Sequence, residues 1–130
     1  MTDWVLIVDD EEMIRENLKA YLEDEGLGVA AFGSVASALD WLRESAVACR
    51  VCIMDMRLPD MDGNTAIRLL HECFPEMEFL IHTGSSNYAL PEDLLVAGLD
   101  DSRVYRKPLD DMAPLAATVQ ILLTSRGVGS

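Results

Sequence analysis

The chain has 130 residues, of which 50% are hydrophobic, and carries a formal net charge of −13 at pH 7. This length suits one domain with a single hydrophobic core. The negative charge argues against direct nucleic-acid binding and against docking on an anionic membrane. No apolar run approaches the roughly 18 residues of a membrane span, and the first residues lack the basic region of a signal peptide, so we expect a cytoplasmic protein.

Five short apolar runs predict buried strands at residues 4–8, 29–32, 51–54, 78–82 and 103–106. Amphipathic spacing predicts a helix after each strand, the fourth of them short and confined to residues 92–97. The signals for helix ends are Gly26, Ser34, Pro75, Gly98, and Asp110 or Asp111. This alternation predicts an α/β fold with right-handed βαβ units, a doubly wound (βα)5 flavodoxin-like three-layer sandwich. We expect one domain at residues 1–124 and a flexible tail at residues 125–130.

Three cysteines occur, Cys49, Cys52 and Cys73. An odd number in a cytosolic protein argues against a disulfide framework. Cys49 and Cys52 form a C-x-x-C pair, but a redox motif of this kind begins a helix, whereas this one runs into a predicted strand. A zinc site would have only His71 and Cys73 as further ligands, so we expect ordinary core cysteines.

Polar side chains follow four of the five predicted strands. Asp9 and Asp10 follow the first strand, Asp55 the third, Thr83 the fourth and Lys107 the fifth, whereas the second strand runs into a glycine. In parallel sheets, ligands bind outside the carboxyl ends of the strands, at the point where the strand order reverses. A sheet order of 2-1-3-4-5 places these four strand ends side by side.

The three carboxylates at this edge repel one another. At a separation of about 5 Å and an effective dielectric constant of about 20, each pair costs roughly 3 kcal/mol. Protonation of one carboxyl group would relieve the repulsion, and so would a bound hard cation such as Mg²⁺. Lys107 alone cannot balance three negative charges. An aspartate can attack phosphorus covalently, while a lysine and a hydroxyl hold the phosphoryl oxygens, so the pattern indicates a phosphoryl site.

The sequence resembles the receiver domains of two-component response regulators from about residue 4 to residue 123. The matching motifs are Val8-Asp9-Asp10, Met54-Asp55 followed by Leu58-Pro59 and Asp62-Gly63, His82-Thr83-Gly84, and Lys107-Pro108. Each motif alone has a structural explanation, such as a solvated helix start or a turn. All four, each at the end of the appropriate strand, favour the resemblance.

The resemblance implies a role for each strand-end residue. Asp55 would accept a phosphoryl group from a sensor histidine kinase or a histidine phosphotransfer protein. Asp10 and Asp55 would bind Mg²⁺ directly, Asp9 would act mainly through water, and the backbone carbonyl of Arg57 would be a further ligand. Lys107 would pair with Asp55 and then with the phosphoryl group. The peptide bond between Lys107 and Pro108 would be cis and would position the lysine.

The resemblance also implies residues that switch the domain and tune it. Thr83 would move its hydroxyl onto a phosphoryl oxygen. In the family an aromatic residue often lies three positions before the lysine, where this chain has Val104. Its aromatic residue, Tyr105, lies one position later and therefore on the other face of the strand. The side chains of Arg57 and Ser85 would tune the lifetime of the phosphoryl group.

Two further details of the sequence differ from, or add to, the family pattern. Gly84, next to the threonine, leaves more room at the site than a larger residue would. The segment at residues 98–107 is about two residues longer than family members lead us to expect, so a bulge or local shift is anticipated there.

We expect a signalling switch that catalyses only its own phosphorylation and dephosphorylation. It would act on a downstream protein through the surface of the fourth helix, fifth strand and last helix, as a monomer or weak homodimer. It would be either a single-domain regulator or a receiver excised from a larger one. Two alternatives are disfavoured. An aspartate-nucleophile phosphatase would need a carboxylate at the position of Arg57, and a flavodoxin-like FMN module would need a phosphate-binding loop at residues 9–12, which are acidic.

Overall fold

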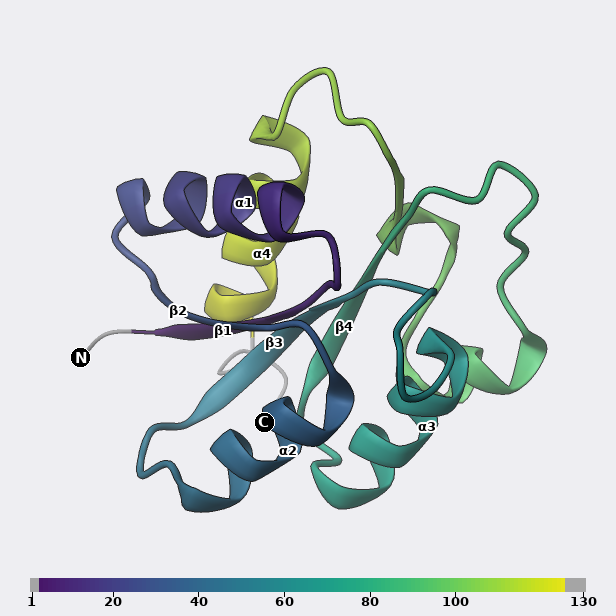
Figure 1. Ribbon diagram of the computed structural model, residues 1–130, viewed down its shortest axis with the longest axis horizontal. Coiled ribbons are helices and arrows are strands. Elements are labelled where there is room, and N and C mark those ends of the chain that lie inside the picture. The colour runs from purple at the N-terminus through teal and green to yellow at the C-terminus, as the bar shows by residue number, and fades with distance from the viewer. Residues whose placement is uncertain (1–2, 126–130) are drawn as a thin grey trace.

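The computed structural model describes residues 3–125, apart from the side chains of residues 96, 97 and 125. Its five strands are β1 (Trp4–Val8), β2 (Gly28–Phe32), β3 (Cys49–Met54), β4 (Glu78–Thr83) and β5 (Val104–Arg106). They form one parallel sheet in the order β2-β1-β3-β4-β5 (Figure 1). The predicted fold class and strand order are confirmed.

Helices cover both faces of this sheet, which gives the three layers (Figure 1). The helices α1 (Glu12–Asp24) and α4 (Ala113–Ser125) lie on one face, and α2 (Val35–Glu44) and α3 (Gly63–Cys73) lie on the other. Successive strand residues point to opposite faces, so each strand contributes to both cores. In β4, for example, Phe79 and Ile81 pack on the α2/α3 side, and Leu80 packs on the α1/α4 side. A sheet buried on both faces explains why the strands are continuous apolar runs.

The loop from β3 to α3 is held by two carboxylates and one glycine. Asp62 caps α3 by accepting a hydrogen bond from the backbone N–H of Thr65 at 2.9 Å. Asp60 reaches across to α2 and accepts from the backbone N–H groups of Val35 and Ala36. A side chain at Gly63 would collide with the backbone of residues 55 and 56, so glycine is required there. These contacts fix the position of the loop that follows β3.

Other helix ends agree with the sequence prediction. Ser34 caps α2 by accepting from the backbone N–H of Ser37, and Asp111 accepts from the backbone N–H of Ala113 at the start of α4. Gly98 has φ +86° and ends the fourth helical segment. The predicted tail at residues 125–130 lies outside the described residues, except for Ser125, which ends α4.

The structure refines two details of the sequence prediction, the form of the fourth helix and the segment before β5, and corrects a third, the burial of Cys73. The fourth helix is a 3₁₀ helix, η1 (Glu92–Ala97), because the six residues between a proline and a glycine are too few for a stable α-helix. A second 3₁₀ turn, η2 (Asp101–Arg103), accommodates the longer segment before β5, which begins at Val104. Cys73 is exposed at the end of α3, although Cys52 is buried and Cys49 half-buried. No helix within residues 3–125 is long and apolar enough to cross a membrane.

Candidate functional site

Asp9 and Asp55 stand at the carboxyl ends of the neighbouring strands β1 and β3. The backbone N–H of Asp9 donates to the carbonyl of Phe32 at 3.0 Å, and that of Asp55 donates to the carbonyl of Val8 at 2.9 Å. The sheet ladder therefore continues into these residues and fixes the direction of their side chains. Both are buried, with 2% and 4% of their surface exposed. Two carboxylates buried side by side need compensating positive charge.

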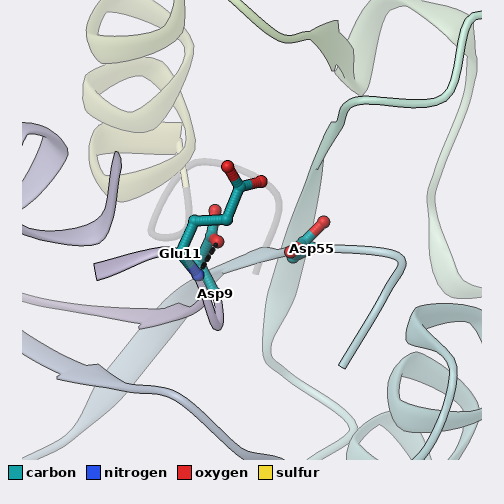
Figure 2. A group of neighbouring side chains, drawn as sticks. All are labelled: Asp9, Glu11 and Asp55. Atoms are coloured by element: carbon teal, nitrogen blue, oxygen red, sulfur yellow. Dashed lines mark hydrogen bonds between the residues drawn. The ribbon is translucent and has the colours of Figure 1, made fainter. Parts of the chain in front are cut away.

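Glu11 brings a third carboxylate to this edge of the sheet (Figure 2). One carboxylate oxygen from each of Asp9, Glu11 and Asp55 lies within 4.8 Å of the others. The backbone N–H of Glu11 donates to Asp9 Oδ1 at 2.9 Å, a turn typical of aspartate that folds the chain back over the strand end. This residue was not among those predicted from the sequence. The signal was its position two residues after Asp9, where such a turn places it.

Lys107 is the positive charge at the centre of this group. Its Nζ lies 2.9 Å from Asp9 Oδ2, 2.9 Å from Glu11 Oε1 and 3.4 Å from Asp55 Oδ2, and only 6% of its side chain is exposed. The backbone N–H of Lys107 donates to the carbonyl of Thr83 at 2.8 Å, which ties it to the end of β4. The Lys107–Pro108 peptide bond is cis, as predicted.

The charges in this group are not balanced. Burial and the negative charge of Asp9 raise the pKa of Asp55 to about 6, although Lys107 acts in the opposite direction. Burial would lower the pKa of Lys107, but its hydrogen bonds to Asp9 and Glu11 outweigh that effect and raise it. Lys107 is therefore fully protonated at neutral pH, and one ammonium faces three carboxylates. The excess negative charge favours a cation or a proton at the site.

The donor atoms fit a hard divalent cation. Within the described part of the chain, Asp55 Oδ2 is buried and has no hydrogen-bond partner, although Lys107 Nζ is within ion-pair distance. The group offers only carboxylate oxygens, which Mg²⁺ prefers as protein ligands together with water. The acidic group therefore fits Mg²⁺.

The other predicted ligands lie around this group. Asp10 is exposed and does not belong to the set of three converging carboxylates. Arg57 is exposed in the loop after β3, and its backbone N–H lies 3.5 Å from Asp55 Oδ1. The predictions that Asp10 and the Arg57 carbonyl bind the metal directly remain predictions.

Thr83 ends β4 with only 1% of its surface exposed. Its Oγ1 accepts a hydrogen bond from the backbone N–H of Ser85 at 3.1 Å, which leaves its hydroxyl proton available for a ligand. At Gly84, an added Cβ would find only the Lys107 side chain at 4.0 Å. The site is therefore open on this side, consistent with the room predicted at Gly84.

Arg106 clamps the loop that carries these residues, and the sequence did not indicate this. Its guanidinium donates to the backbone carbonyl of Ser85 at 2.8 Å and to that of Tyr88 at 3.2 Å. The hydroxyl of Tyr88 in turn donates to Asn64 Oδ1 on α3 at 2.7 Å. The loop between β4 and η1 is thus tied both to β5 and to α3.

Val104 and Tyr105 lie on opposite faces of β5, as the alternation of strand residues predicted. Val104 packs on the α2/α3 core, and Tyr105 packs on the α1/α4 core. The Tyr105 hydroxyl lies 2.5 Å from Thr118 Oγ1 on α4. On the Val104 side, Tyr88 from the loop after β4 packs against the same core and lines one surface pocket together with Val104.

Comparisons with known proteins identify the family. The family model named response regulator receiver domain matches residues 5–119. The chain belongs to this family. It is therefore a signalling module of two-component systems, and its acidic group of Asp9, Glu11 and Asp55 fits Mg²⁺ beside a phosphorylated aspartate.

Two relatives and one solved structure illustrate the similarity. The transcriptional regulatory protein FixJ of Azorhizobium caulinodans is 32% identical over 114 residues, which are 87% of this chain and 52% of that protein. The transcriptional regulatory protein AruR of Pseudomonas aeruginosa is 35% identical over 113 residues, 85% of this chain and 45% of that protein. This chain thus spans about half the length of these relatives.

The structural similarity covers nearly the whole chain. A CheY-like response regulator receiver domain protein from Methanospirillum hungatei superimposes with a TM-score of 0.80 at 27% identity. The superposition covers 99% of this chain and 100% of that one.

The raised pKa of Asp55 makes stability depend on pH in the metal-free protein. Below pH 4 the carboxyl group is protonated in both the folded and the unfolded chain. As pH rises from about 4 to about 6, the unfolded chain ionises first, so the folded state loses stability. We expect Asp55→Asn, which carries no charge, to be more stable than the wild type by about 1–3 kcal/mol at pH 8, with the difference disappearing below pH 4. Urea unfolding with a chelator measures this. A difference that does not depend on pH would contradict the assignment.

The contacts of Arg106 are expected to stabilise the loop after β4 locally rather than the fold as a whole. In Arg106→Ala, the amides of residues 84–90 should exchange with deuterium about fivefold faster or more, because two charge-assisted hydrogen bonds to the loop backbone are lost. Arg103→Ala is the matched control, because Arg103 pairs with Glu78 at the other end of the strand pair. Unchanged exchange in Arg106→Ala, or equal acceleration in both variants, would contradict the clamp.

Proposed function

We propose that this domain accepts a phosphoryl group on Asp55 from a phosphohistidine of a sensor histidine kinase or a histidine phosphotransfer protein. The observation that carries the proposal is the position of Asp55: buried at the end of β3, beside Asp9, with Lys107 Nζ at 3.4 Å. An Asp55 oxygen attacks phosphorus and forms a P–O bond, the P–N bond breaks, and the imidazole leaves with the bonding electrons. Attack by water later releases inorganic phosphate and restores the carboxylate.

In this proposal Lys107 and Thr83 hold the transferred group. Lys107 already pairs with Asp55, and its ammonium moves to a phosphoryl oxygen once the carboxylate charge is consumed. The Thr83 hydroxyl donates to another phosphoryl oxygen, since its own oxygen already accepts from Ser85. The two side chains end adjacent strands of one sheet, so both can reach the same group.

We assign the Mg²⁺ ligands as Asp10, Asp55 and the backbone carbonyl of Arg57, with Asp9 acting through water. The contacts of Asp9 support this assignment, because Oδ1 accepts from the Glu11 N–H and Oδ2 pairs with Lys107. Bound there, Mg²⁺ would neutralise negative charge on the carboxylates and the phosphoryl oxygens.

Three residues near Asp55, the exposed Arg57 and Gly84 and the half-buried Ser85, are proposed to set the lifetime of the acyl phosphate. In this proposal the Arg57 side chain and Ser85 would flank the phosphoryl position, and the open space beside Gly84 would leave it accessible to water. Larger side chains at Gly84 would exclude water and slow hydrolysis.

The signal is proposed to leave through a change of population at η1, β5 and α4, read by a downstream protein. Along this route Thr83 ends β4 beside β5, Val104 packs on the α2/α3 core, and the Tyr105 hydroxyl contacts Thr118 of α4 on the other face. The relatives named above are transcriptional regulatory proteins about twice as long, so an attached output domain is an alternative to a domain that acts alone. We propose a cytoplasmic monomer or weak homodimer that itself contacts neither DNA nor membrane, in keeping with its net charge of −13.

Intact mass after incubation with a small phosphodonor and Mg²⁺ tests the phosphoacceptor. We expect the wild type to gain the mass of one phosphoryl group and Asp55→Asn to gain none. Asp60→Asn is the matched control, since Asp60 lies five residues later and caps α2. An adduct that persists in Asp55→Asn, or no adduct in the wild type, would contradict the proposal.

Thermal unfolding with and without Mg²⁺ tests the metal ligands. We expect Mg²⁺ to raise the unfolding midpoint of the wild type. Most of this increase should be lost in Asp10→Asn but kept in Glu11→Gln. The midpoint is a better readout than tryptophan fluorescence, because Trp4 packs against Trp41 at the amino end of β1. The reverse pattern, with Glu11→Gln losing the response and Asp10→Asn keeping it, would assign the ligand to Glu11 instead.

A further inference from the structure

Glu11 makes a closer contact with Lys107 than the proposed phosphoacceptor does. Its Oε1 accepts a hydrogen bond from Lys107 Nζ at 2.9 Å, whereas Asp55 Oδ2 lies at 3.4 Å and has no hydrogen-bond partner within residues 3–125. An ammonium group has three N–H donors. The two short contacts of this ammonium go to Glu11 and to Asp9, also at 2.9 Å, so the residues that follow β1 hold the lysine more closely than Asp55 does.

The two close partners of the lysine differ in how firmly they are held. Asp9 is buried at the end of β1, its backbone N–H continues the sheet ladder, and its Oδ1 accepts from the Glu11 N–H. Glu11 occupies the N-cap position of α1, but its side chain makes no capping hydrogen bond and is 57% exposed. Its carboxylate can turn into solvent without loss of a helix contact. Glu11 is therefore the partner that Lys107 can release, and Asp9 is the one it keeps.

Phosphoryl transfer to Asp55 would require Lys107 to change partners. In the proposed reaction the ammonium bonds to a phosphoryl oxygen and stabilises the negative charge on it. The backbone N–H of Lys107 stays bound to the Thr83 carbonyl, so the change involves the end of the side chain. A contact that exists before the reaction and is broken in the transition state raises the activation barrier. The contact between Glu11 and Lys107 is of this kind.

We propose that Glu11 is a positioning residue that holds the Lys107 ammonium away from Asp55 in the unphosphorylated domain, and that phosphorylation exchanges this contact for one with a phosphoryl oxygen. The inference rests on the proposed function of Asp55 and adds a residue that slows phosphoryl uptake. An ion pair with one largely exposed partner is weak. Glu11 therefore limits the rate of phosphorylation without preventing it.

The contact itself is tested without metal and without a phosphodonor. Carbon-13 NMR of the full chain in a chelator follows the ε-methylene resonance of Lys107, assigned by its absence in Lys107→Arg. Glu11→Asp keeps the negative charge but shortens the side chain by one methylene group, which withdraws the carboxylate from Nζ. We expect the resonance to shift in Glu11→Asp and to stay in place in Glu12→Asp, the same change at the next, exposed residue. No shift in Glu11→Asp, or equal shifts in both variants, would overturn the proposal.

The rate of phosphorylation tests the consequence of the contact. Intact mass is followed over time with Mg²⁺ and phosphoramidate, from which an Asp55 oxygen takes the phosphoryl group: the P–O bond forms, the P–N bond breaks, and ammonia leaves with the bonding electrons. We expect Glu11→Asp to react about threefold faster than the wild type, and Glu12→Asp to react at the wild-type rate. Because both substitutions conserve charge, repulsion of an anionic donor cannot produce this difference.

Two kinds of failure are distinguishable in this experiment. A wild type that gains no phosphoryl group would overturn the proposed function of Asp55 and, with it, this inference. A wild type that gains the group at the same rate as Glu11→Asp, or faster, would leave the proposed function standing and overturn the role of Glu11.

Discussion

Lys107 is one ammonium group held by three carboxylates from two segments that are distant in sequence. It bonds to Asp9 after β1 and to Glu11 at the start of α1, and it pairs with Asp55 after β3. The site therefore carries more negative than positive charge, and this imbalance determines what it can bind. Because one cation cannot satisfy three acids, two of them buried, the site gains by binding Mg²⁺ or by holding a proton on Asp55. The same lysine would be released toward a phosphoryl oxygen when Asp55 loses its charge.

The fold places these groups by simple means. Parallel strands end at one edge of the sheet, and backbone hydrogen bonds carry the sheet ladder into Asp9 and Asp55. The loop after Asp55 is fixed by Asp60 and Asp62, which bond to the first turns of α2 and α3. The sheet ladder therefore holds the backbone of Asp55, whereas the loops after β3 and β4 are held mainly by side-chain hydrogen bonds.

Local sequence patterns predicted the strands, their order and most of the strand-end residues. Apolar runs and glycine or proline ends depend only on residues that are neighbours in the sequence, and strand alternation by itself predicted that Val104 and Tyr105 lie on opposite faces. The features that were missed depend on contacts across space. Glu11 reaches the site through a turn on Asp9, and Arg106 reaches the carbonyls of a loop about twenty residues earlier. The short η1 helix took its 3₁₀ form because its flanking proline and glycine left too little length, which spacing alone did not show.

A direct titration of the Asp55 carboxyl group tests the central claim most closely. Carbon-13 NMR of the side-chain carboxyls in the metal-free protein should give a midpoint near pH 6 for Asp55, because burial and Asp9 raise its pKa. Addition of Mg²⁺ should lower this midpoint markedly, since a bound cation favours the ionised form. A midpoint near the ordinary aspartate value of about 4, unchanged by Mg²⁺, would contradict the view that the unbalanced charge around Lys107 raises the pKa of Asp55 and favours a bound cation.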